Sequence, residues 1–585
     1  MQTSTFRPRN SLSASDNEAE LAAPDSGEQS GFFSLARHFF AHNAAVNGLM
    51  IFAIVIGFFQ GWMKLHVRGG WVTFAFDIPV MLALLITVTS IRRGRHLFPD
   101  CNMGKVLIAL TAIGILYVVL PFGVPLLISL ASFRAWCMIP LVFLVGYHAT
   151  RTVRQIEVYL WLLSILGVIV SVYAAFFQTA EEVQELMKMD PELMFRLQTS
   201  FYADSSGHGV FRRFSTFVSS AAFGGMMAYC TTFAVARLAH PGCSWLERIW
   251  LIASSVIMCY GVVISGSRSS LITLFVGIGF SAWYRGGIML ALGAPLVGVA
   301  SLGLGYLTIG ASAFERFGTL LDSDVVGQRM NIVFEPAWYS LMEYPLGGGL
   351  GRSGHGVPMI LYQSAREIEI RTIDGDLGRM VVDMGIVGLV VFAAMVIVGI
   401  SDAFRWMIKL RGSPLGVVGL PAGSMFILAA SQLVYGSPFL GIPGGVLLWF
   451  FLGSMRRLVE DYDKLVQVVG QEQADVASQF VSFITPHRLM PLFKQDQRQR
   501  NQGTRVRGLT TKSTQSVPTA GAPTNSGAMS SVAPGRIPSL MAGNPSWKAG
   551  AGPVATPGNL RKPDVTKRFL FRRPADSPDR RRPRP

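Results

Sequence analysis

Residues 156–177 read IEVYLWLLSILGVIVSVYAAFF, a long apolar run in which Glu157 is the only charged side chain. A bilayer core about 30 Å thick is crossed by about 20 apolar residues in a helix, and lipid offers no partners to unpaired backbone groups. The run therefore predicts a membrane-spanning helix. Similar runs predict about a dozen spans: residues 46–63, 71–91, 106–124, 134–149, 156–177, 214–236, 246–265, 270–284, 287–309, 380–403, 415–434 and 438–454.

The composition agrees with these spans. Half of the 585 residues are hydrophobic and 15% are charged, which is unusual for a soluble chain of this size. The sequence predicts an all-α, polytopic transmembrane helical bundle with a large external loop that contains short helices. The net charge of +16 lies mostly in short loops and a basic C-terminal tail. It therefore favours a membrane setting and no nucleic-acid partner.

The two ends of the chain differ from the apolar part. Residues 1–42 are polar, and no apolar stretch follows Met1, so we expect a disordered cytoplasmic segment. The transmembrane domain is predicted over residues 43–457, followed by a cytoplasmic helix over 458–484. Residues 485–585 are rich in Pro, Gly, Ser, Thr and Arg, a composition that cannot bury a core. We expect this tail to be disordered and drawn to anionic lipid.

The distribution of Lys and Arg in short loops predicts the orientation. Lys64 and Arg68 lie on the other side and oppose the pattern. The sequence predicts a multi-pass protein of the bacterial inner membrane with both termini in the cytoplasm, and two long outer segments, 178–213 and 310–379. The loops that the pattern assigns to the cytoplasm are residues 91–96, 150–155, 237–248, 285, 404–412 and 456–457.

The outer segments contain more than simple connections. Residues 180–198 place apolar side chains at helical spacing, which indicates amphipathic helices on the membrane surface. EPAWYSLMEYP predicts a short helix that begins at Pro336 and ends before Pro345. LGGGLGRSGHG (346–356) follows as a flexible or tightly turned strap.

Five cysteines are scattered without a CxxC motif or a pairing with histidine. The pattern supports neither a zinc site nor a disulfide framework, so we expect ordinary buried thiols. No metal and no cofactor are predicted.

A group of arginines lies at the predicted outer ends of the spans. One interpretation is that they reach lipid headgroups or pair with Asp322, Asp324, Glu367 and Glu369. As a group they would repel one another unless an anion joined them, and guanidinium groups fit phosphate oxygens in pairs. A diphosphate on a polyprenyl carrier has its head group at this depth. The group consists of Arg213, Arg268, Arg329, Arg352, Arg366, Arg371 and Arg379.

Four stretches in this order resemble the conserved blocks of the bacterial O-antigen ligase and polysaccharide polymerase superfamily over roughly residues 200–400. SGSR at a helix start and PLGGGLG are the most specific parts of the resemblance. The four are RRFSTFVSSAAFGGMMAY (212–229), VISGSRSSLITLFVG (263–277), QRMNIVFEPAWYSLMEYPLGGGLG (328–351) and DGDLGRMVVDMGIVGLVVF (374–392).

The resemblance implies a glycosyltransferase that takes a glycan from undecaprenyl diphosphate at the periplasmic face, without a metal or nucleotide sugar. Arg213 and Arg268 match the family's arginines and would hold the diphosphate, stabilising the leaving group. Arg329 matches a basic residue that would orient glycan or phosphate, and Arg352 is a further candidate for binding the diphosphate. The expected partners are the carrier-linked glycan, membrane lipid and a chain-length regulator protein.

The sequence departs from the family at one position. Family members often begin the last block with a His-Asn pair, where this chain has Asp374 and Gly375. Asp374, Asp376 and His355 are therefore the candidate catalytic bases, although a lone loop histidine is more often plain surface. The departure favours a polymerase, with a ligase that transfers a carrier-linked glycan to a lipid or protein as the alternative. A lipid-linked oligosaccharide transporter or flippase is a second alternative.

Asp77 stands inside a predicted span, where an ionisable group usually faces a cavity or a partner. The sequence leaves three interpretations open: a pair with Arg68, a position along the carrier groove, or a place at the interface. Trp62, Trp71 and Trp338 are expected to anchor at the bilayer boundary or to pack.

Overall fold

A computed structural model describes residues 43–67, 72–91, 96–120, 122–189, 201–203, 209–238, 243–285, 298–303, 305–307, 323–357, 375–411, 413, 415–433 and 436–469. Contacts divide the chain into residues 1–509 and 510–585, and all described residues belong to the first unit. The predicted N-terminal segment 1–42 and tail 485–585 lie outside the described residues.

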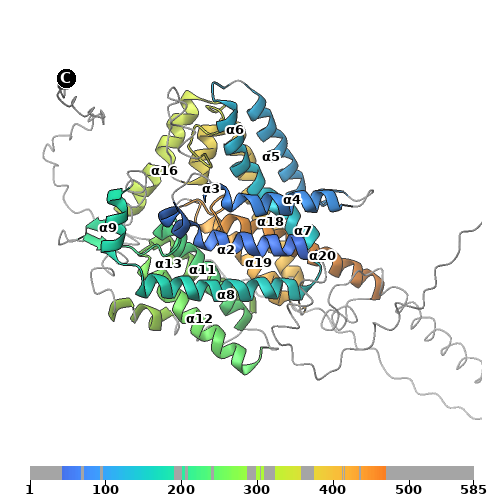
Figure 1. Ribbon diagram of the computed structural model, residues 1–585. Helices are drawn as coiled ribbons and strands as arrows, with labels where there is room; N and C mark the ends of the chain where they lie inside the picture. Colours follow the sequence, from blue (N-terminus) through green and yellow to red (C-terminus); the bar gives the residue numbers. More distant parts are fainter. Residues whose placement is uncertain are drawn as a thin grey trace, which may run out of the picture. The chain divides into compact units, whose positions relative to one another are not determined.

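The described residues form a mostly helical protein with one small pair of antiparallel strands (Figure 1). The elements are α2 (Ala44–His66), α3 (Val72–Ala75), α4 (Asp77–Ser90), α5 (Asn102–Val119), α6 (Leu126–Phe133), the π-helix η3 (Arg134–Met138), α7 (Ile139–Ala149), α8 (Val153–Phe176), α9 (Ala180–Met189), β1 (Phe201–Ala203), β2 (Gly209–Phe211), α11 (Ser220–Leu238), α12 (Trp245–Ile264), α13 (Arg268–Arg285), α16 (Ser323–Glu343), α18 (Asp376–Leu410), α19 (Gly416–Ser431) and α20 (Gly444–Val469).

Six stretches of helix are long and apolar enough to cross a bilayer, so this is a membrane protein by length and composition. Large apolar side chains on them, such as Val119 (74% exposed) and Ile397 (66%), are exposed as lipid-facing residues are. The predicted count of about twelve spans is not confirmed and stays a prediction. The six are Ala44–His66, Asn102–Val119, the continuous α6–η3–α7 stretch Leu126–Ala149, Val153–Phe176, Trp245–Ile264 and Asp376–Leu410.

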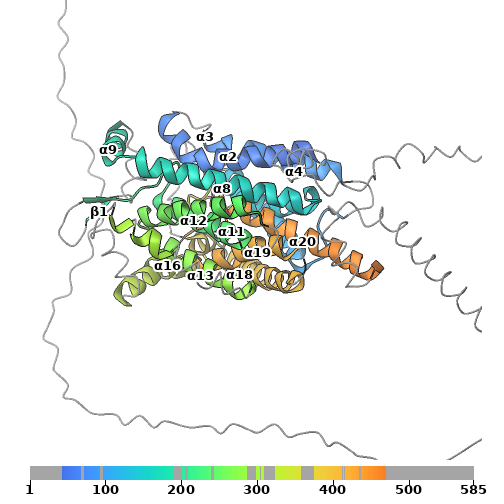
Figure 2. The same ribbon diagram turned by 90° about the horizontal axis from the view of Figure 1, so that it is seen from below.

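The span predicted over 214–236, which contains most of α11, is less apolar than the others because protein surrounds it. α11 packs against α8, α12, α13 and α19, and nearly all of its side chains are buried by these neighbours. A helix surrounded by protein does not need a lipid-facing stripe, so it accommodates Thr231 and Thr232, which donate to carbonyls one turn earlier. In Figure 2, α2 and α4, then α8, then α11 and α12 follow one another in layers.

Two predicted spans begin or divide elsewhere than expected. The span predicted over 134–149 begins at Leu126, because Pro125 precedes the first turn and η3 continues the helix into α7. The span predicted over 71–91 is divided at Phe76 into α3 and α4. Arg134 is therefore inside a spanning helix instead of at its end.

Two other helices run beyond their predicted limits. The helix predicted to begin at Pro336 begins at Ser323, so Pro336 lies inside α16, although the predicted stop before Pro345 is confirmed. α20 continues without interruption through the boundary predicted at residue 457. The amphipathic helix predicted after residue 180 is present as α9, whose Val183 packs with Phe214.

Glycines allow close contact between α7 and α20. A Cβ atom at Gly146 would lie 2.0 Å from Phe450 O, and one at Gly453 would lie 2.0 Å from Phe143 O. The two helix backbones therefore touch, as small residues permit in membrane helix pairs. All five cysteines are free, as expected from their spacing.

Candidate functional site

α18 is broken near its beginning, and the glycine strap (residues 346–356) fills the break. Gly385 has φ 59° and ψ −143°, a conformation that L side chains rarely adopt. The interruption leaves backbone groups without helical partners, and these must be satisfied in a buried setting. The bonds that do so are Gly348 N to Val382 O (2.8 Å), Gly349 N to Asp383 O (3.1 Å), Ile386 N to Pro345 O (2.9 Å) and Tyr117 Oη to Met384 O (3.0 Å).

The strap is tightly turned, which decides between the two predicted alternatives. Its glycines 347, 349, 351, 354 and 356 all have positive φ. A Cβ at Gly347 would lie 2.6 Å from the backbone of α18, so the strap approaches closer than any side chain allows. The PLGGGLG and DMGIVG stretches are therefore two halves of one interlocked structure.

Asp383 ties the strap to the helices beneath it. Its carboxylate is fully buried and accepts bonds from Ser353 N (2.7 Å), Ser353 Oγ (2.9 Å), Trp136 Nε1 (2.8 Å) and Ser132 Oγ (3.3 Å). A buried carboxylate needs such donors, because its desolvation is otherwise unfavourable. Asp383 thus fixes Ser353 relative to α6 and η3.

The π-helix η3 brings Arg134 to the same place. Arg134 Nη1 forms an ion pair with Asp77, and its Nη2 donates to Gly356 O of the strap at 2.8 Å. Only 15% of the Arg134 side chain and 4% of the Asp77 side chain are exposed. Asp77 therefore has a partner that the sequence did not suggest, and Arg68 lies outside the described residues. Single π-turns of this kind occur often at functional sites.

His355 lies between η3 and the start of α18. Its ring is 5.0 Å from that of Trp136, and its Nδ1 is 3.4 Å from Arg379 Nη1. Burial lowers the pKa of His355 well below its usual value, and the charges of Arg379 and Arg134 lower it further. The imidazole is therefore neutral at physiological pH.

The neutral state predicts a pH dependence of stability. Because the folded-state pKa of His355 is depressed, the unfolded chain takes up a proton first as pH falls through about 6.5, and the folded state loses stability there. The His355→Gln variant lacks this contribution, so wild-type protein should lose about 1.4 kcal/mol more than the variant between about pH 7.5 and about pH 5.5. Thermal unfolding in detergent measures both slopes. The charges that act on the ring, those of Arg379 and Arg134, are the same in both proteins, so equal slopes would contradict the neutral state.

Arg379 and Asp376 connect the first turn of α18 to the loop before α20. Arg379 Nη1 donates to Ser437 Oγ at 2.8 Å, and Asp376 Oδ2 accepts from Phe439 N at 3.0 Å. Asp376 is fully buried. Of the predicted catalytic residues, His355 contacts Arg379 of the same helical turn that carries Asp376, whereas Asp374 lies outside the described residues.

The two arginines that match the family's pattern start from adjacent segments. Arg213 N donates to Ile264 O at 3.3 Å, at the end of α12, and Arg268 begins α13 after the turn at Gly266 (φ 58°). The neighbouring Arg212 Nε donates to Ser265 O of the same turn at 3.2 Å. Arg213 Nη1 donates to Ala174 O and Ala175 O at the end of α8, where the carbonyls favour a cation.

Residues that follow α19 make polar contacts with α13 and with Arg379. Gln432 Nε2 donates to Thr273 Oγ1 of α13 at 2.7 Å, and Gln432 lies directly after α19, in the segment that continues to Ser437. The structure therefore brings α13, the segment after α19 and the start of α18 together.

Of the other predicted arginines, the structure describes the side chain of Arg352 alone. Arg352 stacks on the Tyr344 ring at 4.4 Å and donates to its hydroxyl at 3.2 Å. Arg329 belongs to α16, but its side chain is not among those described. Arg366 and Arg371 lie outside the described residues.

Sequence reasoning missed Arg134, Trp136 and Asp383. Asp383 stands in a predicted span, and an ionisable residue there is itself a signal. Arg134 was placed at a span's end, where arginines are ordinary. Nothing in the sequence distinguishes Trp136 from a packing residue.

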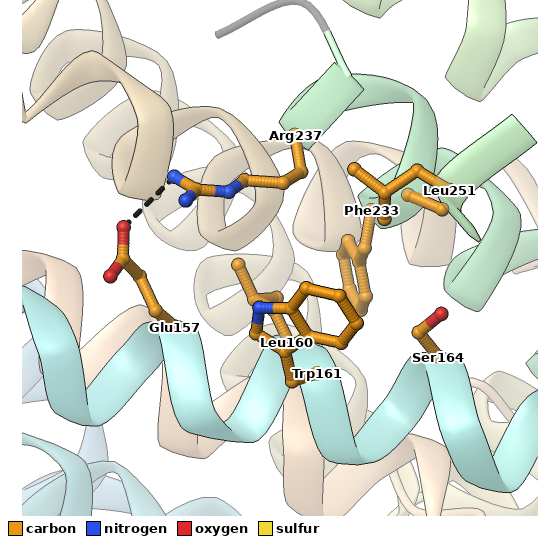
Figure 3. A pocket seen from close by; sticks show the side chains of 8 residues that line it. Glu157, Leu160, Trp161, Ser164, Phe233, Arg237 and Leu251 are labelled. Atoms are coloured by element: carbon orange, nitrogen blue, oxygen red, sulfur yellow. Dashed lines mark hydrogen bonds and ion pairs between the residues drawn. The ribbon is translucent and has the colours of Figure 1, made fainter. Parts of the chain in front are cut away.

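A separate hollow lies at the other end of α8, where α8, α11 and α12 meet (Figure 3). It measures about 300 Å³ with the solvent-open space at its mouth. Arg237 closes one side by pairing with Glu157 at 2.8 Å and Glu247 at 3.0 Å. No predicted site residue lines it. The lining residues are Glu157, Leu160, Trp161, Ser164, Phe233, Ala234, Arg237 and Leu251.

The apolar helices, the broken α18 and the buried polar cluster define a helical membrane protein with an ordered polar site at the strap. No protein-family model and no curated protein sequence matches the chain.

Proposed function

We propose that the protein is a glycosyltransferase of the bacterial inner membrane that polymerises repeat units carried on undecaprenyl diphosphate. In this proposal about twelve helices cross the membrane, both termini are cytoplasmic, and the strap faces the periplasm. The observation that carries the proposal is the bond from Arg213 N to Ile264 O, because it sets the Arg213 backbone beside the turn that presents Arg268, while Arg213 Nη1 also donates to Ala174 O and Ala175 O. Two guanidinium groups that begin from neighbouring backbones can bind one diphosphate together.

The roles follow from side-chain chemistry. Arg213 and Arg268 hold the diphosphate and stabilise charge on it as the sugar leaves, while Arg329 and Arg352 orient the glycan or its phosphates. A base accepts the proton of the acceptor hydroxyl, and the candidates are Asp374, Asp376 and His355. A chain-length regulator is the proposed protein partner, and neither metal nor cofactor takes part.

Alanine at Arg213 or Arg268 tests the proposal. Removing one donor to a developing oxyanion lowers rates by about 100-fold or more, so polymer should fall to near the background of a deletion strain. Polymer amount and length are measured by gel analysis of cells that express each variant. Arg405→Ala, an exposed arginine near the far end of α18, should leave polymer unchanged. Wild-type polymer from a stably inserted Arg213→Ala and Arg268→Ala protein would contradict the proposal.

The ligase alternative separates from polymerisation by what accumulates on the carrier. A polymerase variant should leave single repeat units on undecaprenyl diphosphate, whereas a ligase variant should leave long chains. Mass analysis of carrier-linked glycans in the same strains distinguishes them.

Transport remains the second candidate because of the break in α18. Broken helices with buried ionisable residues are typical of transporter binding sites, and Asp383 lies two residues before Gly385. A flippase variant would leave repeat units on the cytoplasmic leaflet, which a membrane-impermeant glycan-modifying reagent reports. Repeat units on the periplasmic leaflet of the Arg213→Ala strain would exclude this candidate.

A further inference from the structure

Two neighbouring side chains each carry a buried nitrogen atom without an acceptor. Arg134 Nε and His355 Nε2 are both buried, and neither has a hydrogen-bond partner in the described structure. Buried donors are nearly always paired, because leaving one unpaired is unfavourable by about 1 to 3 kcal/mol. Two such donors in one cluster therefore call for an acceptor.

Printed contacts hold the two side chains in one cluster. Arg134 Nη2 holds Gly356 O at 2.8 Å, and Gly356 directly follows His355. Trp136, two residues after Arg134 on η3, packs its ring 5.0 Å from that of His355. Asp77 fixes the Arg134 guanidinium from its other side. Neither donor can therefore turn away to another partner without breaking these contacts.

The tautomer of His355 follows from its neighbour. A guanidinium group only donates, so the ring nitrogen that faces Arg379 Nη1 at 3.4 Å must accept. In a neutral imidazole the other nitrogen then carries the proton. His355 Nε2 is thus an N–H donor. A base needs a free lone pair on the atom that accepts the proton, and this nitrogen has none.

We propose that Arg134 Nε–H and His355 Nε2–H together bind one oxyanion of the substrate, a phosphate or carboxylate oxygen, and that His355 acts as a neutral donor and not as the base. Three features favour an anion over a hydroxyl group: both groups donate, neither accepts, and the guanidinium groups of Arg134 and Arg379 lie close by. The inference rests on the proposed function for the identity of the substrate. The oxyanion belongs either to the carrier diphosphate or to an acidic sugar of the glycan.

Replacement of His355 by glutamine and by alanine separates a donor from a base. Glutamine keeps an N–H donor near the position of Nε2 but cannot serve as a base, whereas alanine provides neither. We expect polymer synthesis by His355→Gln within about tenfold of wild type, and by His355→Ala about 100-fold lower. Equal loss in both variants would show that His355 is the base and overturn the inference.

A binding measurement decides the inference even if polymerisation proves not to be the activity. Purified protein in detergent is titrated with inorganic pyrophosphate and separately with glucuronate, and the Kd is measured calorimetrically. His355→Ala should weaken binding of one of these anions by about tenfold, whereas His355→Gln and the control Arg405→Gln should not. The anion affected identifies the source, pyrophosphate for the carrier and glucuronate for an acidic sugar.

Arg134 is tested in a variant in which its ion-pair partner Asp77 is also replaced. Arg134→Gln alone would leave Asp77 as an unpaired buried carboxylate, so the double variant Asp77→Asn and Arg134→Gln is used. It should weaken binding of the same anion by about tenfold or more. Unchanged affinity in both His355→Ala and the double variant, or no binding by wild-type protein, would overturn the inference.

Discussion

Alanine at Gly385 is expected to prevent the protein from reaching its folded state. The added Cβ would lie 2.3 Å from Pro345 O and 2.4 Å from Gly347 N, and all three nearest atoms belong to backbone. The φ of 59° with ψ of −143° adds strain of about 1 to 3 kcal/mol for any L residue. Because the strap is bonded to α18 on both sides of the break, neither segment can shift alone. We expect a loss of more than about 4 kcal/mol, comparable to the larger single-residue effects in proteins.

Gly48→Ala is the matched control. Gly48 lies in α2, and nothing lies within 4 Å of the place where its Cβ would be. Alanine in a helix interior is favoured over glycine by about 1 kcal/mol, so this variant should be as stable as wild type or slightly more stable. Yield of monodisperse protein in detergent and its unfolding temperature measure both variants. Wild-type behaviour of Gly385→Ala would mean that α18 is continuous.

Alanine at Asp383 is expected to have the next largest effect, about 4 kcal/mol of unfolding free energy. Four donors lose their acceptor at once, and Ser353 N and Trp136 Nε1 are in buried positions where water does not replace the carboxylate. The strap should detach from η3, which also displaces His355. Chemical unfolding in mixed micelles measures the change.

Asp402 provides the control on the same helix. It is also buried, but its carboxylate accepts a single hydrogen bond among the described contacts, from Met103 N at 3.3 Å. Asp402→Ala should therefore destabilise by about 1 to 2 kcal/mol. Equal destabilisation by the two substitutions would show that the bonds to Asp383 do not hold the strap.

The apolar runs of the sequence located the helices because lipid and backbone chemistry leave few other choices. Their ends were less predictable. The sequence predicts a span over 134–149 that is shorter than the observed helix, because Ser129 and Ser132 interrupt the apolar pattern. Both side chains are nevertheless buried against protein. The sequence predicts a helix start at Pro336, but α16 begins at Ser323 and continues through it.

The candidate site was only partly predictable. Glycines at 347, 349 and 351 predict either a flexible or a tightly turned strap, and the structure shows the tightly turned one. The partners of those turns could not be inferred, since Gly385 reads as an ordinary glycine of an apolar helix. Arg134 and Trp136 meet His355 only because η3 rotates the helix at that point, a tertiary effect without a local signal.

The interlock between strap and α18 also determines where the chain tolerates a change in length. The backbone groups of Pro345, Gly348 and Gly349 are bonded to those of Ile386, Val382 and Asp383, so one residue inserted between Pro345 and Gly348 would shift these bonds out of register. Families of related sequences should accordingly keep a constant spacing between Pro345 and Gly349 and between Val382 and Ile386.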